Sequence, residues 1–364
     1  EIALPEGLKQ SIEKIKKGDT VLSNYGSGDM RPARVTRVFS KKVSGELIRI
    51  TTQNGRVLTS TAEHMHFDGY RLGLTPQMFF TYLMHKRGRG WRLGVSQTYT
   101  KGQCEPMIGF QQRCNQEHGD AVWIVGTHKT SQEARILEYQ LSLSYGIPTL
   151  PFVARKGSIG GYVHDQVVLD RIFASFDTEQ GAQRLLKVQG LLKEYPHHRA
   201  RATRSDRRNI VVALCGEHRG KTPLHRISMV GSDVEGKKLL QAAGFSVRSA
   251  KKGSLSWRFE TAYKEYGALL DTVRHLQDIF PDAHLVRTAR LGGKKARLRD
   301  GNSLPFLPAA SVRPGMALFD DAGGFDVVKE IVRVPVKNES VYDLDIEYTH
   351  NFIANGIVTH NCIY

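Results

Sequence analysis

The C-terminal stretch constrains the fold and the chemistry of this chain more than any other part of the sequence. Residues 341–346 alternate apolar and polar side chains, which is typical of a half-buried strand. The chain then reaches His360, Asn361 and Cys362. An asparagine carboxamide lies one methylene from its backbone, so its nitrogen can close a ring on its own carbonyl. These residues therefore predict strands that lead to a self-cleaving peptide bond.

The residues on either side of Asn361 carry the chemistry that such a cleavage needs. A histidine such as His360 is a proton donor that can work near neutral pH. Cys362 becomes a nucleophile when its thiol, with an unperturbed pKa of about 8.5, loses a proton. The peptide bond after Asn361 is thus followed directly by a nucleophile, the Cys362 thiol.

The whole ending resembles the C-terminal splicing blocks of inteins, including the seven-residue step from Asp343 to His350. The resemblance implies an all-β splicing domain of the horseshoe-shaped Hint fold. It also implies roles: Asp343 tunes Cys362 and helps the branching step, and His350 and His360 supply protons. Asn361 cyclises to a succinimide, and Cys362 takes the acyl group. Residues 362–364 would then belong to the host protein.

Residues 1–75 predict short strands separated by glycines, with a hairpin turn at Asn54-Gly55. Thr61 and His64 match the Thr-x-x-His block of the same family. The resemblance implies that His64, held by Thr61, assists cleavage at the N-terminal junction. Inteins of the common class begin with Cys or Ser, several residues before a stretch like this one. Either that nucleophile precedes Glu1, or the N-terminal step is disabled. Without it, we expect cleavage before Cys362 but not full splicing.

The positive charge of the chain lies in its middle. Residues 1–75 and 300–364 together hold 16 Lys and Arg against 17 Asp and Glu, whereas residues 76–299 hold 36 against 19. This distribution indicates a polyanion-binding module set into a neutral shell. The expected insert comprises a nuclease domain (76–155), a helical connector (156–196) and a basic DNA-binding module (197–299), and the splicing domain resumes at 300–361. The predicted fold class is therefore an all-β splicing domain split by an α/β insert.

Strands are predicted at residues 79–84, 91–95 and 122–125, followed by a helix that begins with the capping box of Thr130 and Glu133. This order resembles a GIY-YIG nuclease. The resemblance implies that Tyr82 helps to activate water, that Arg113 holds the phosphate and that Glu138 binds Mg²⁺. Arg92 stands where the family prefers Tyr in its second motif.

Residues 209–280 predict a strand–strand–helix–strand–strand–helix order that resembles half of a LAGLIDADG homing endonuclease. The helix with paired acidic residues that is diagnostic of that family is missing here. We therefore expect this module to bind DNA rather than cut it. Basic side chains on extended strands mostly contact phosphates. The expected DNA contacts are Arg199, Arg201, Arg204, Arg207, Arg208, Arg226, Arg248, Lys251, Lys252 and Arg258.

The prediction is a monomeric intein that carries a homing DNA endonuclease. Its partners would be the flanking extein sequences and double-stranded DNA, with no cofactor for splicing and Mg²⁺ for the nuclease. The sequence has no long apolar run, no signal peptide and no paired cysteine spacing, which favours a cytoplasmic protein without membrane contact. Three alternatives are a LAGLIDADG-type or DNA-binding-only insert, a homing endonuclease with a vestigial splicing half, and a self-processing Hint protein without ligation. The Asn361-Cys362 ending argues against the last.

Overall fold

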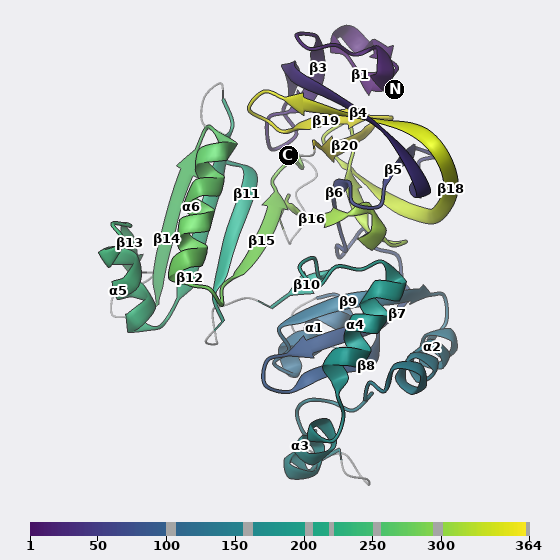
Figure 1. The fold of residues 1–364 in the computed structure, drawn as a ribbon, viewed down its shortest axis with the longest axis vertical. Helices are drawn as coiled ribbons and strands as arrows, with labels where there is room; N and C mark the ends of the chain where they lie inside the picture. The colour runs from purple at the N-terminus through teal and green to yellow at the C-terminus, as the bar shows by residue number, and fades with distance from the viewer. Residues whose placement is uncertain are drawn as a thin grey trace.

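The computed structural model describes residues 1–99, 107–155, 163–200, 207–217, 222–249, 256–293 and 301–361. The chain is a mixed α/β protein in which strands predominate (44%). Over the described residues, 16 strands form one large mixed sheet and four form a small antiparallel sheet. Figure 1 shows three parts, with both chain ends in the strand-rich part at the top.

The first part is built from the two ends of the chain. Strand β4 (Met30–Thr52) pairs antiparallel with β18 (Phe325–Ile346) along most of its length. Inward apolar residues of β4 alternate with outward polar ones, as the predicted half-buried strands require. The other elements are β1 (Ile2–Ala3), η1 (Pro5–Gly7), β2 (Lys9–Gln10), η2 (Ile12–Lys14), β3 (Thr20–Asn24), β5 (Val57–Thr61), β6 (Met65–Gly69), β16 (Leu304–Pro308), η5 (Ala309–Ser311), β17 (Ala317–Phe319), β19 (Asn351–Ala354) and β20 (Ile357–His360).

The second part contains the small sheet, in the order β10-β9-β7-β8. Its helix α2 has the predicted capping box of Thr130 and Glu133 and ends at Gly146, which has a φ of 64°. Leu185 of α4, within the expected connector, joins the core around Trp91. His198 and Arg199, expected in the basic module, form β10, which pairs with β9. The elements are β7 (Phe79–Lys86), β8 (Gly90–Gln97), α1 (Gly109–Gln116), β9 (Ala121–His128), α2 (Ser131–Tyr145), α3 (Gln166–Ala174), α4 (Thr178–Gln189) and β10 (His198–Arg199).

The third part, hereafter the basic module, follows the predicted strand and helix order. It comprises β11 (Asn209–Glu217), β12 (Leu224–Gly231), α5 (Val234–Ala242), β13 (Val247–Ser249), β14 (Trp257–Tyr263), α6 (Tyr266–Ile279) and β15 (His284–Ala289). Helix α6 covers one face of this sheet (Figure 1) and contributes Leu269 and Val273 to a core with Trp257.

The basic module is hydrogen-bonded into the first part. Strand β15 runs parallel to β11 and antiparallel to β16, and β16 pairs with β6. The sheet therefore continues from the basic module into the part that holds the chain ends, a continuity the sequence did not predict. Among the described residues, no helix combines the length and apolar character needed to cross a membrane.

The close approach of β7 and β8 generates a stability prediction. Gly94 lies opposite Tyr82, and a Cβ at Gly94 would lie 2.4 Å from the Tyr82 ring. We expect Gly94→Ala to lower the free energy of unfolding in urea by about 1–3 kcal/mol, as overpacked sites do. Gly267→Ala is the matched control, because nothing lies within 4 Å of its Cβ. It should instead raise stability by roughly 0.5–1 kcal/mol. Equal changes in the free energy of unfolding for both substitutions would contradict the close packing of Gly94 against Tyr82.

Candidate functional site

The hairpin of β19 and β20 brings both ends of the described chain into one region. Ile2 pairs with Ala354, and the Glu1 ammonium donates to Asn355 Oδ1 at 2.8 Å. Strand β20 ends at His360, directly before Asn361. The first residue thus lies at the turn of the hairpin and Asn361 lies at its open end.

Asn361 is fully buried and held at two atoms. Its backbone nitrogen donates to the carbonyl of His350 at 3.2 Å. Its side-chain nitrogen Nδ2 donates to Asp345 Oδ1 at 2.6 Å, and His350 Nδ1 lies 3.7 Å from the same oxygen. His350 adopts a φ of 52°, which turns the chain back so that it meets Asn361. The structure therefore brings the predicted residues His350 and Asn361 together around Asp345.

Asp345 was not predicted, although it lies two residues after the predicted Asp343. Because side chains alternate along a strand, both carboxylates share one face of β18. Arg37 on β4 is the direct cross-strand partner of Asp345 and contacts Oδ2 through Nε at 3.0 Å and Nη2 at 2.9 Å. Burial tends to raise the pKa of Asp345, but His350, Arg37 and Thr36 outweigh it and hold the pKa at about 2. Asp345 is therefore ionised at neutral pH.

His360 lies in an aromatic pocket, with its ring centroid 4.8 Å from that of Phe306 and 5.6 Å from that of Phe67. Burial, reinforced by His350 and His64, lowers its pKa well below the usual value. The imidazole is thus neutral near pH 7 and can donate a hydrogen bond through a ring N–H. Neither its ring nitrogens nor Asn361 Oδ1 has a hydrogen-bond partner among the described residues. Such buried unpaired atoms cost about 1–3 kcal/mol each.

A cavity of about 670 Å³ adjoins the hairpin and is lined by Glu1, Thr61, His64 and Asp343, among others. Thr61 and His64 therefore share one cavity with the distant Asp343 and with the first residue. The His64 ring bonds through Nε2 to Thr359 Oγ1 at 3.0 Å, and its backbone nitrogen donates to the Thr61 carbonyl at 3.2 Å. Burial lowers the pKa of His64, an effect that Asp343 partly offsets.

The cavity histidine belongs to a chain of polar contacts that was not predicted. Thr359 Oγ1 also lies 3.2 Å from His66 Nδ1, and His66 Nε2 lies 3.0 Å from Ser60 Oγ. The sequence signal was the spacing of His64, directly before β6, and His66 on that strand, whose ring centroids lie 4.9 Å apart.

The basic module packs directly against the turn that carries His350. His225 Nδ1 accepts from the Cys215 amide at 3.2 Å, so Nε2 carries the hydrogen and donates to the Tyr348 carbonyl at 2.7 Å. The rings of His225 and Tyr266 lie 5.7 Å and 5.2 Å from the His350 ring, centroid to centroid. Burial is the main cause that lowers the pKa of His225 to about 4.

The second candidate cluster lies on the small sheet and gathers the predicted nuclease residues. Tyr82 on β7 accepts from Arg92 Nη1 on β8 at 3.2 Å. Burial raises the pKa of Tyr82, an effect that Arg92 and Arg113 partly offset. Burial likewise raises the pKa of Glu138 on α2, and nearby Arg92 opposes this. Arg92 thus lies close enough to influence both Tyr82 and Glu138, and Arg113 influences Tyr82.

Glu117 is a further member that the sequence did not signal. It is buried, and its Oε1 lies 2.7 Å from Arg92 Nη1 and 3.6 Å from Arg155 Nη2. Its Oε2 accepts from the Phe152 amide at 3.0 Å. Glu117 therefore fixes Arg92 beside Tyr82.

Glu138 alone offers a carboxylate to a cation here, and the described residues hold no cluster of three metal-binding side chains. No hydrogen bond or ion pair engages Glu138 within the described part of the chain. One carboxylate completed by water and a substrate phosphate fits Mg²⁺, which keeps several waters in protein sites. The donor set is thus compatible with Mg²⁺ and unsuited to a metal held by protein alone.

Three of the predicted DNA-binding arginines lie on the face of the basic module opposite α6. Arg226, Arg248 and Arg258 surround Glu260 at 2.8, 3.9 and 2.9 Å. Arg226 pairs across the strands with Ala262, and Arg248 pairs with Arg258. Because Arg258 and Ala262 lie on the same side of β14, all three arginines lie on one face of the sheet. Four others, Arg201, Arg204, Lys251 and Lys252, lie outside the described residues, as does Cys362.

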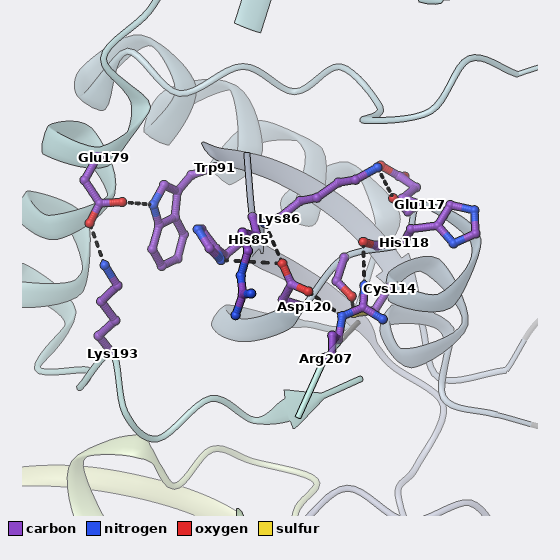
Figure 2. Close-up of polar contacts among 12 residues, drawn as sticks. His85, Lys86, Trp91, Cys114, Glu117, His118, Asp120, Glu179, Lys193 and Arg207 are labelled. Carbon is purple, nitrogen blue, oxygen red and sulfur yellow. Dashed lines mark hydrogen bonds and ion pairs between the residues drawn. The ribbon is translucent and has the colours of Figure 1, made fainter. Parts of the chain in front are cut away.

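Of the remaining predicted arginines, Arg199 lies on β10 of the small sheet, Arg207 contacts that sheet, and Arg208 lies directly before β11 of the basic module. Figure 2 shows Arg207 against Asp120, and its Nη2 also donates to the His118 carbonyl at 2.8 Å. Arg208 contacts Asp233 at 3.2 Å, and burial lowers the pKa of Arg199 to about 10. The DNA-binding role of these three stays a prediction, and Arg207 also joins the basic module to the small sheet.

A scan against protein-family models and a search of curated proteins find no match to this chain.

His225 generates a prediction for stability against pH. The folded protein keeps this ring neutral down to about pH 4, whereas the unfolded chain binds a proton below about pH 6.5. The stability that His225 contributes is therefore complete above pH 6.5 and is lost as the pH falls from 6.5 to 4. We expect His225→Gln to make the decline of unfolding free energy shallower by up to about 1.4 kcal/mol per pH unit in this window. Urea unfolding at several pH values measures it, and parallel curves for both proteins would contradict it.

Proposed function

We propose that this chain is an intein, with a Hint-type splicing domain formed by its two ends and a DNA endonuclease set between them. The observation that carries the proposal is the setting of Asn361. Its carboxamide nitrogen is bonded to Asp345 and its backbone nitrogen to His350, and its oxygen has no partner among the described residues. A buried asparagine held in this way before a cysteine is suited to ring closure.

In the proposed reaction, Asn361 Nδ2 attacks the Asn361 carbonyl carbon and the bond to Cys362 breaks. His360 precedes the reacting residue and is neutral, so it acts through a ring N–H that donates to the leaving nitrogen. The aromatic pocket keeps water from the site and favours ring closure over hydrolysis.

The cavity beside Glu1 supports the proposed N-terminal step. His64 is oriented by Thr359 and lies beside Asp343, so an imidazole and a carboxylate face the same space. A scissile amide seated there would receive a hydrogen bond from His64 when its nitrogen departs.

For the insert, we propose metal-dependent cleavage of double-stranded DNA. Tyr82 has a raised pKa and would orient the attacking water as a neutral hydroxyl, while Arg113 and Arg92 would offset phosphate charge. Glu138 would hold Mg²⁺, which supplies stabilisation of the leaving oxygen. Arg226, Arg248 and Arg258 would contact phosphates on the open face of the basic module.

The splicing proposal is tested by removing the proposed nucleophile. With a reporter fused after Tyr364, we expect Asn361→Ala to abolish release of the reporter, because alanine has no nitrogen to close the ring. Gel electrophoresis over time measures the release. Asn338→Gly is the matched control, since Asn338 is exposed and in a left-handed conformation (φ 56°), and it should cleave normally. Release from Asn361→Ala at the unmodified rate would reject ring closure.

The nuclease proposal is tested at Glu138, the proposed metal ligand. We expect Glu138→Gln to lower Mg²⁺-dependent cutting of an intein-free target site at least a hundredfold, since it removes the charge that would hold the metal. Glu235→Gln on α5 removes an exposed carboxylate of another helix and should leave cutting unchanged. Cutting by the Glu138 variant at the unmodified rate would contradict the assignment of Glu138 as the metal ligand.

A further inference from the structure

Asp345 contacts the atom of Asn361 that must react. Its Oδ1 accepts from Asn361 Nδ2 at 2.6 Å, the length of a strong hydrogen bond to a charged acceptor. The Asp345 side chain is only 13% exposed, so little water competes for this oxygen. Asp343, the carboxylate that the sequence singled out, lines the separate cavity beside Glu1.

The second oxygen of Asp345 is held in place from the opposite strand. Arg37 donates through Nε and Nη2 to Oδ2 in a two-pronged contact, and the register places Arg37 directly across from Asp345. Two contacts to one oxygen fix the plane of the carboxylate, which leaves Oδ1 aimed at Asn361.

We propose that Asp345, oriented by Arg37, is a catalytic residue that positions the Asn361 carboxamide for ring closure and accepts its proton. This inference rests on the proposed splicing function. When the bond from Nδ2 to the carbonyl carbon forms, the nitrogen must lose one proton. Asp345 Oδ1 takes this proton and the bond to the nitrogen of residue 362 breaks. The proton then passes from Asp345 to that nitrogen through the neutral His360 ring, which accepts a proton at one nitrogen as it gives up the hydrogen of the other, so the Asp345 carboxylate and the neutral imidazole are regenerated. The products are a succinimide and a free amine, with no net change in protons.

Two carboxylates of β18 lie at two different sites. Asp343 and Asp345 point to the same side of β18, yet one faces the cavity that holds Glu1 and the other faces Asn361. Substitution of Asp345 should therefore slow the C-terminal cleavage while the cavity beside Glu1 keeps its own carboxylate, Asp343.

The test measures the first-order rate of reporter release from the full chain with a reporter after Tyr364. We expect Asp345→Asn to slow release about tenfold to a hundredfold, in the lower range for loss of a general base. Arg37→Ala should slow it several-fold, because the carboxylate remains but is free to rotate. Asp321→Asn, which breaks another Arg–Asp pair of the same part of the protein, should release at the normal rate.

Folding is followed in each variant by its thermal unfolding midpoint. Arg37 is 56% exposed, so Arg37→Ala is expected to fold even if Asp345→Asn does not. Release by a folded Asp345→Asn or by Arg37→Ala at the normal rate would overturn this inference while leaving the splicing proposal intact. No release from the unmodified chain would instead reject the splicing proposal itself.

Discussion

The antiparallel ladder between β4 and β18 is the interaction on which the rest of the structure depends. It joins residues 30–52 to residues 325–346 across the whole insert. Its register sets Phe39 opposite Asp343 and Arg37 opposite Asp345. Because a slip by one residue would turn every side chain to the other face, this register also decides which carboxylate meets Asn361.

Strands β6 and β16, which carry Phe67 and Phe306, explain how a site with unpaired buried groups can persist. His360 and Asn361 Oδ1 lack hydrogen-bond partners among the described residues, which is unfavourable. Aromatic packing by Phe67 and Phe306 holds the His360 ring. The surrounding strands thus keep these atoms away from water and in place for the bond that follows Asn361.

Much of the strand pattern could be predicted, because alternation of apolar and polar residues is a local property. The spacing of His350, His360 and Asn361 along one hairpin was visible for the same reason. The role of Asp345 could not be predicted, because it depends on Arg37, which is distant in the sequence. The parallel pairing of β11 with β15 and the ion pair of Arg207 with Asp120 likewise depend on partners that no local pattern identifies.

The basic module is continuous with the part of the protein that holds both chain ends. Its sheet continues through β15 and β16 into β6, and His225 bonds to the turn before His350. The rigidity of the C-terminal site therefore depends partly on the basic module, which also carries the open arginine-bearing face.

The central claim is that the Asn361 carboxamide, held by Asp345, closes on its own carbonyl. The most direct measurement is the intact mass of the chain after release of a C-terminal flank. Ring closure predicts a product lighter by one water molecule than the chain that ends in Asn361 with a free carboxylate. A product with the full mass of the hydrolysed chain from the start of the reaction would contradict it.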